Sequence, residues 1–160
     1  MRISLFAVGR LKSGPEKELA SRYLDRFAKA GPGVGLEFAR VVEVAESRAS
    51  SSGTRKREEA AALEKALPDN AVLVLLDEHG KTLDSESFAQ TLGRLRDAGK
   101  RDLMVAIGGA DGLDPVLHEK ASLVINLGTM TWPHQLVRIL IAEQLYRAVT
   151  ILAGHPYHRA

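Results

Sequence analysis

Short apolar runs alternate along the chain with stretches in which apolar residues recur at helical spacing. Strands are predicted over residues 3–8, 35–44, 71–76, 103–107 and 123–127. Helices are predicted over residues 15–30, 54–67, 84–99, 114–121 and 132–153. The serine-rich residues 47–53 are expected to form a mobile loop. This alternation predicts an α/β fold with a largely parallel sheet and helices on both of its faces.

The apolar run over residues 71–76 defines one strand most clearly. Every residue from Ala71 to Leu76 is apolar, whereas a strand at the edge of a sheet commonly alternates apolar and polar positions. We therefore expect this strand to lie inside the sheet, covered by helices on both faces, and to end at Leu76. The polar residues after it are expected to form a loop.

Length and composition narrow the class of protein. The chain has 160 residues and no cysteine. This length is typical of a single domain, over residues 1–160, and the lack of cysteine excludes disulfides, thiolate nucleophiles and zinc ribbons. No run of eighteen apolar residues occurs, and the apolar start is too short for a signal peptide. We therefore expect a cytosolic protein without a membrane segment.

The charge is distributed unevenly along the chain. The net charge is +2, but residues 1–65 carry +4, residues 66–128 carry −4 and residues 129–160 carry +2. A surface for nucleic acid would therefore have to come from the two ends of the chain. Its non-specific affinity should be modest, because this affinity grows with the number of phosphates neutralised. An ordinary mixed surface explains the same distribution.

Three predicted strands are followed by glycine-containing segments, at residues 76–80, 107–112 and 127–134. Ligands of open parallel sheets bind beyond the carboxyl ends of the strands. Glycine allows the backbone to approach a ligand, so these segments could bind a flat heterocycle such as adenine; each could equally be a tight turn.

A dinucleotide fingerprint and a phosphate-binding loop are both absent from the sequence, and the histidines lack the spacing of a metal site.

The last predicted helix carries polar residues on two sides. At about 100° per residue, His134 and Arg138 lie within roughly 40° of each other, and Glu143 and Arg147 share a nearly opposite face. The apolar surface between these faces predicts a subunit interface. Glu143 and Arg147 could alternatively form an ordinary solvated pair.

The residues after this helix are unusual for a chain end. Residues 155–160 combine two histidines with Tyr157 and Arg159. This set can stack on a base, contact phosphate and move a proton. A plain surface tail is the alternative interpretation.

Several motifs taken together resemble one known family. They are IGGADGL at residues 107–113, MTWPHQ at 130–135, EQLYRA at 143–148 and PYHR at 156–159, with Arg138 and the pairs Leu76-Asp77 and Gly80-Lys81. The combination is similar to ribosomal large subunit methyltransferase H, and the likeness covers essentially the whole chain. Members of that family are small SPOUT-class enzymes that methylate N3 of a pseudouridine in 23S ribosomal RNA.

The resemblance implies a SPOUT-type α/β knot, in which about residues 71–160 bind S-adenosylmethionine and the C-terminal part forms a trefoil knot. It also implies a homodimer that acts on ribosomal RNA or the assembled ribosome and uses no metal. Carried over by position, the cofactor-binding residues are Leu76, Gly108, Leu127, Gly128, Thr129, Met130, Thr131 and Trp132.

The same resemblance directs the choice of catalytic residues. A neutral histidine can accept the N3 proton of the pyrimidine, and His158 is the first choice, with His134 second. Tyr157, Arg138 and Arg159 complete the predicted set. These two arginines and Arg147 are expected to contact phosphates or to orient Glu143. If a dimer brings residues 155–160 over the partner's cofactor, the active site is shared between subunits.

Two other functions remain open at this point. The chain could be a non-catalytic RNA-binding or ribosome-assembly protein on the same fold. It could also methylate a ribose 2′-oxygen instead of a base.

Overall fold

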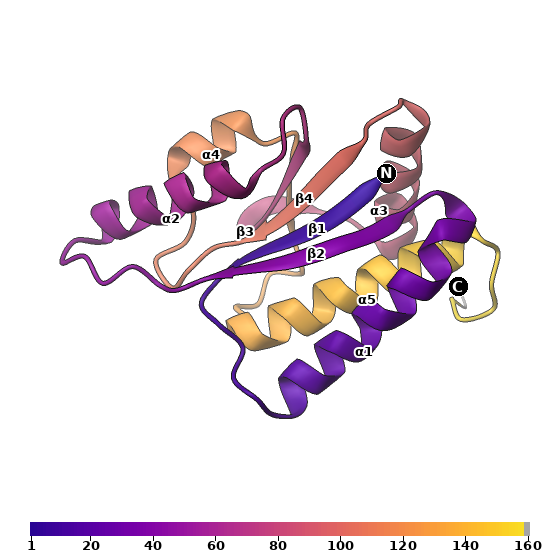
Figure 1. Cartoon of the computed structure of the whole chain (residues 1–160), viewed down its shortest axis with the longest axis horizontal. Helices are drawn as coiled ribbons and strands as arrows, with labels where there is room; N and C mark the ends of the chain where they lie inside the picture. Colours follow the sequence, from indigo (N-terminus) through magenta and orange to yellow (C-terminus); the bar gives the residue numbers. More distant parts are fainter. Residues whose placement is uncertain (159–160) are drawn as a thin grey trace.

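The computed structural model describes residues 1–158, which form a five-stranded sheet covered by helices on both faces (Figure 1). The strands are β1 (Arg2–Val8), β2 (Glu37–Val44), β3 (Val72–Thr82), β4 (Asp102–Ile107) and β5 (Leu123–Asn126). The helices are α1 (Pro15–Ala30), the 3₁₀ helix η1 (Gly31–Val34), α2 (Ser52–Ala66), α3 (Ser85–Asp97), α4 (Pro115–Lys120) and α5 (His134–Leu152). All strand pairs are parallel, in the order β2-β1-β4-β3-β5. The predicted α/β class is confirmed.

Alternate residues of each strand face opposite layers of helices, as the two-residue period of a strand requires. On one face, Leu5 of β1 and Val105 of β4 pack with residues of α1, α3 and α5. On the other face, Phe6 and Met104 pack with residues of α2 and α4. β3 lies between β4 and β5, and its covered faces explain the unbroken apolar run over residues 71–76.

Side chains that precede α2 and α4 cap the first turns of these helices. The Ser51 hydroxyl accepts a hydrogen bond from the Thr54 N–H at 3.1 Å, and the Asp114 carboxylate accepts one from the Val116 N–H at 3.0 Å. These bonds satisfy N–H groups that have no partner within a helix. With Ser51 as the cap, α2 begins at Ser52, so the loop before it ends two residues earlier than the sequence predicted.

The prediction that β3 ends at Leu76 is wrong, because the strand continues to Thr82. Its pairing with β5 shifts register after Leu76 and resumes with Lys81 beside Ile125. A Cβ atom at Gly80 would lie only 2.5 Å from the backbone carbon of Ile125, so this extension requires glycine. The sequence did not predict this extension because its residues are polar. Polar residues are compatible with this part of β3, since it pairs with β5 alone.

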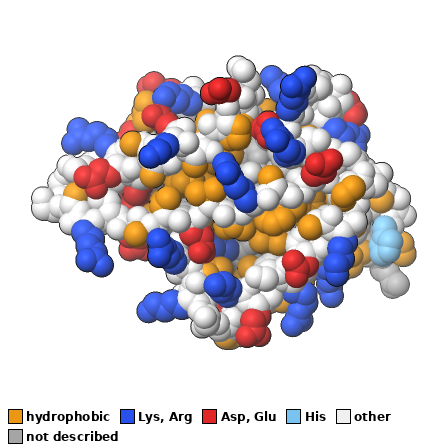
Figure 2. Space-filling view, viewed as in Figure 1, with side chains coloured by type: hydrophobic (Ala, Val, Ile, Leu, Met, Phe, Trp, Pro, Cys, Tyr) orange, Lys and Arg blue, Asp and Glu red, His pale blue; other side chains and the backbone are white. Residues whose placement is uncertain are grey.

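The molecular surface on the side of β2 and α1 is mixed in charge. Figure 2 shows Lys and Arg interspersed with Asp and Glu, around hydrophobic side chains along the middle of this face. Among the residues that the structure describes, this face therefore has no continuous basic area of the kind that binds nucleic acid. Within residues 1–158, no helix is long and apolar enough to cross a membrane.

Candidate active site

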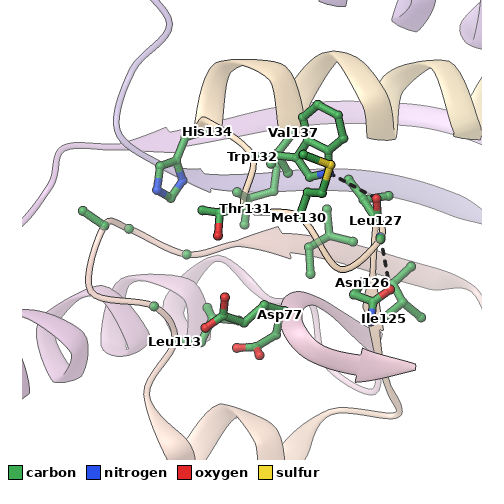
Figure 3. A pocket seen from close by; sticks show the side chains of 18 of the residues that line it. Asp77, Leu113, Ile125, Asn126, Leu127, Met130, Thr131, Trp132, His134 and Val137 are labelled. Carbon is green, nitrogen blue, oxygen red and sulfur yellow. Dashed lines mark hydrogen bonds between the residues drawn. The ribbon is translucent and has the colours of Figure 1, made fainter. Parts of the chain in front are cut away.

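Residues 76–78 in the middle of β3 and the carboxyl ends of β4 and β5 surround a cavity of about 300 Å³ (Figure 3). The segments after β4 and β5 and the start of α5 complete its wall. The cavity lies where open parallel sheets bind their ligands, and its volume is at the lower end of the range for small-molecule sites. The lining residues discussed below are Leu76, Asp77, Gly108, Asp111, Leu127, Gly128, Met130, Thr131, Trp132 and His134.

Seven of the eight predicted cofactor-binding residues line this cavity, and Thr129 is the exception. His134, the second choice for the base, also lines it. The structure thus brings together the three strand ends that the sequence singled out, although Asp77 belongs to β3 itself and not to a loop. Contact between these residues and a cofactor stays a prediction.

The glycine loop, residues 108–112, forms the wall after β4. The Gly112 N–H donates to the Gly109 carbonyl at 3.0 Å, and Gly112 has a φ of +82°, which favours glycine. A Cβ atom at Gly108 would lie 3.0 Å from Leu113 Cδ2. The glycine loop therefore offers backbone groups, more than side chains, to a ligand.

Hydrogen bonds fix the segment that follows β5. Asn126 Oδ1 accepts from the Gly128 N–H at 3.2 Å, and Trp132 Nε1 donates to the Leu127 carbonyl at 3.2 Å (Figure 3). Met130 and Trp132 are nevertheless 73% and 39% exposed. The cavity therefore has an apolar rim.

Asp77 places a carboxylate in the cavity wall, where its side chain is only 13% exposed. His118 Nε2 of α4 lies 3.2 Å from Asp77 Oδ2, and the His79 N–H donates to Oδ1 at 2.9 Å. Burial opposes ionisation of Asp77, but the hydrogen bonds outweigh burial and lower its pKa. The wall is therefore negatively charged at neutral pH. Within residues 1–158, no cluster of three or more His, Cys, Asp and Glu side chains could hold a metal ion.

Arg138 lies one turn after His134 but is not among the residues that line the cavity. Its side chain is 7% exposed, and its guanidinium donates to Glu43 and to the carbonyls of Val8 and Gly9. Its buried Nε has no hydrogen-bond partner within the described part of the chain. Arg138 thus joins α5 to the carboxyl ends of β1 and β2, and in this arrangement it does not face an RNA phosphate.

Residues 155–158 fold back onto the second half of α5. Tyr157 Oη donates to Glu143 Oε1 at 3.1 Å, and Arg147 Nη2 donates to the same oxygen at 2.6 Å. His158 Nδ1 lies 3.3 Å from Arg147 Nη1, and its Nε2 lies 3.5 Å from Glu86 of α3. Burial and the hydrogen bond to Glu143 raise the pKa of Tyr157 to about 12. Glu143 and Arg147 therefore belong to a partly buried cluster and are not a simple solvated pair.

Residues 155–158 lie beside the second half of α5, whereas His134 is the first residue of this helix and lines the cavity. His158 contacts Arg147, which follows His134 by 13 residues, or about 20 Å along the helix. His134 and His158, the two candidate bases, therefore do not meet within one chain. Arg159 lies outside the described residues.

The chain is similar in sequence to methyltransferases of one family. A family model described as "Predicted SPOUT methyltransferase" matches residues 1–158. A protein of Rhizobium meliloti (strain 1021), named "Ribosomal RNA large subunit methyltransferase H", is 79% identical over 160 residues, which is 100% of both chains. A protein of Agrobacterium fabrum (strain C58 / ATCC 33970) with the same name is 74% identical over 159 residues, which is 99% of each chain.

Two solved structures share the fold. A probable methylase family protein from Haemophilus influenzae Rd KW20 has a TM-score of 0.52 at 13% identity and covers 99% of this chain and 70% of its own. A probable methyltransferase from Bordetella pertussis Tohama I has a TM-score of 0.51 at 17% identity and covers 92% and 95%. At these identities the likeness concerns the fold alone, and the trefoil knot stays a prediction.

Proposed function

Because the chain belongs to the SPOUT methyltransferase family, and within it to the large subunit ribosomal RNA methyltransferases H, we propose that it methylates N3 of a pseudouridine in 23S ribosomal RNA. S-adenosylmethionine is the methyl donor of SPOUT methyltransferases. The observation that carries the proposal is the cavity at the strand ends, where seven positions implied by the resemblance meet. A ribosomal substrate also fits the cytosolic location expected from the sequence.

The cavity has the chemistry that S-adenosylmethionine requires. The backbone of the glycine loop and of residues 127–132, together with Leu76 and Trp132, suits a neutral, flat adenine. The Asp77 carboxylate suits a cationic ligand, and the cofactor carries sulfonium and ammonium cations. We therefore assign the cavity to this cofactor, which when bound supplies an electrophilic methyl group.

The protein must also remove a proton from the pyrimidine. The N3–H group belongs to an imide, whose nitrogen is a poor nucleophile until the proton leaves. An imidazole that accepts this proton would leave the electron pair on N3 free to bond to the methyl carbon, while the electron pair of the broken carbon–sulfur bond would stay on S-adenosylhomocysteine, the leaving group. We keep His158 as the proposed base, acting at the cavity of the partner subunit. His134, which lines the cavity of its own subunit, is the alternative.

A homodimer would unite the two ends of α5 in one active site. Met130, Trp132 and Leu136, at the mouth of the cavity and the start of α5, are 73%, 39% and 39% exposed. A two-fold contact in which the two α5 helices run antiparallel would cover these side chains and bring the partner's residues 155–158 over the cavity. Tyr157 and Arg159 would then join His158 beside the RNA.

One experiment separates this proposal from its two rivals. The protein is incubated with S-adenosylmethionine that carries a deuterated methyl group and with ribosomes that lack the modification; free large subunits and naked 23S RNA are parallel substrates. Nuclease digestion and mass spectrometry then identify the labelled nucleoside. We expect the label on N3 of pseudouridine. A label on the ribose would indicate 2′-O-methylation, and cofactor binding without any label would indicate a non-catalytic RNA-binding protein.

A further inference from the structure

Helix α2 contacts the wall of the cavity through Arg55. Arg55 Nε donates to Asp111 Oδ2 at 2.6 Å and Nη2 donates to Oδ1 at 3.0 Å, which is a bidentate pair. Asp111 belongs to the glycine loop and lines the cavity. The two side chains are 28% and 29% exposed, so the pair is partly shielded from water. Helix α2 and the cavity wall are thereby joined directly.

The same guanidinium holds a second segment, which we call the edge loop, residues 45–51 between β2 and α2. Arg55 Nη1 donates to the Ala49 carbonyl at 2.9 Å and to the Ser50 carbonyl at 3.2 Å. One turn further along α2, Glu59 Oε1 accepts from the Ser47 N–H at 3.1 Å. A single face of α2 therefore holds the edge loop and the glycine loop together.

The glycine loop depends on these contacts because its own sequence gives it little rigidity. Three of its five residues are glycine, the residue with the greatest conformational freedom. Within residues 1–158, Arg55 makes the only side-chain hydrogen bonds to this loop. Glu59 also lies against it, since a Cβ atom at Gly109 would be 2.8 Å from Glu59 Oε2. The shape of the cavity wall is thus determined partly by α2.

We propose that Arg55 is a positioning residue for the cofactor cavity, which couples the glycine loop to the edge loop through Asp111. The inference rests on the cavity being the S-adenosylmethionine site of the proposed function. A ligand that contacts the glycine loop favours the arrangement in which Asp111 meets Arg55, and this arrangement also holds the carbonyls of Ala49 and Ser50. Coupling of this kind is reciprocal, so an ordered edge loop must in turn tighten ligand binding.

The test uses the full chain and S-adenosylhomocysteine as the probe. Calorimetry measures the affinity, and hydrogen exchange measures protection of residues 45–51 with and without the probe. For Arg55→Ala and for Asp111→Asn we expect affinity at least about fivefold weaker, with loss of the probe-induced protection seen in the parent. The double variant should bind within about twofold of the weaker single variant, because both changes break the same contact. Arg55→Lys should recover only part of the affinity, since lysine lacks the planar fork.

Lys120→Ala is the matched control, because Lys120 pairs with Glu64 and also joins α2 to another element without touching the glycine loop. Its affinity should stay within about twofold of the parent, with protection retained. An Arg55→Ala variant that binds like the parent, or that still shows the protection, would overturn the inference. If Arg55→Ala does not fold, the isosteric Asp111→Asn is judged by the same two criteria. A parent protein that does not bind the probe would instead contradict the cofactor assignment.

Discussion

Replacing Arg138 by leucine removes the guanidinium that joins α5 to the ends of β1 and β2. The carbonyls of Val8 and Gly9 lose the guanidinium as a donor, and within residues 1–158 the carboxylate of Glu43 keeps only the Leu11 N–H, which donates to its Oε1 at 3.0 Å. Loss of one partner from a buried ion pair costs about 3–5 kcal/mol. Glu43 is 28% exposed, so water can reach its carboxylate and we expect about 3 kcal/mol, the lower end. For a domain of this size that corresponds to a fall in Tm of about 6–12 °C.

Thermal unfolding followed by circular dichroism measures this change. Arg2→Ala is the control, because Arg2 also pairs with a carboxylate, on Asp102, but is 60% exposed. It should lower Tm by no more than about 2 °C. Adding Glu43→Leu to Arg138→Leu should recover part of the loss, since the unpaired carboxylate is removed. An Arg138→Leu variant with the Tm of the parent but weaker binding to ribosomes would refute this reasoning. It would indicate instead that Arg138 contacts an RNA phosphate, as expected from the sequence.

Three further changes test other parts of the structure. Gly108→Val adds a side chain whose Cβ would lie 3.0 Å from Leu113 Cδ2, so S-adenosylhomocysteine should bind at least about tenfold more weakly in calorimetry; unchanged affinity in a folded variant would exclude this site. Gly80→Ala places a methyl group 2.5 Å from the Ile125 backbone and should cost at least about 2 kcal/mol in urea unfolding, so wild-type stability would argue against the extension of β3. The pKa of Tyr157 is raised from 10.0 to about 12, so its stabilising effect is complete below pH 10 and is lost as the pH rises toward 12. In a tyrosinate absorbance titration the parent should show a late step that Tyr157→Phe removes, and persistence of that step would assign it to another tyrosine.

The sequence predicted the sheet and its helices because burial imposes a strict pattern on each element. Strands covered on both faces, such as residues 71–76, must be apolar throughout, and some helix starts carry capping residues such as Asp84 and Asp114. The extension of β3 lacked such a pattern because it has a single strand neighbour and exposed polar side chains. Its one signal is Gly80, and a lone glycine in a polar segment is equally typical of a turn.

The position of the cavity could be predicted because the carboxyl ends of neighbouring parallel strands share one edge of the sheet. The contacts that support the cavity wall could not be predicted, because each contact joins residues that are distant in sequence. Arg55 and Asp111 are 56 residues apart, and His118 and Asp77 are 41 apart. These contacts depend on the strand order β2-β1-β4-β3-β5, which places α2 and α4 on the same face of the sheet, beside the cavity. The location of His158, beside Arg147 in the second half of α5 and away from the cavity, likewise follows from the folded chain and not from its motif.

The shared active site is tested most directly by combining two inactive subunits. Gly108→Val damages the cavity and leaves the tail intact, whereas His158→Ala damages the tail and leaves the cavity intact. Loss of a general base commonly lowers the rate by about 10²–10⁴, so His158→Ala alone should methylate ribosomes very slowly. Gly108→Val alone should also be slow when the cofactor concentration is kept well below that needed to fill its weakened cavity. When the two are co-expressed in equal amounts, half of the dimers are mixed and each has one complete site, so we predict about a quarter of the parent activity. Activity no higher than that of the separate variants would contradict the shared site and place the base within the same chain as the cofactor.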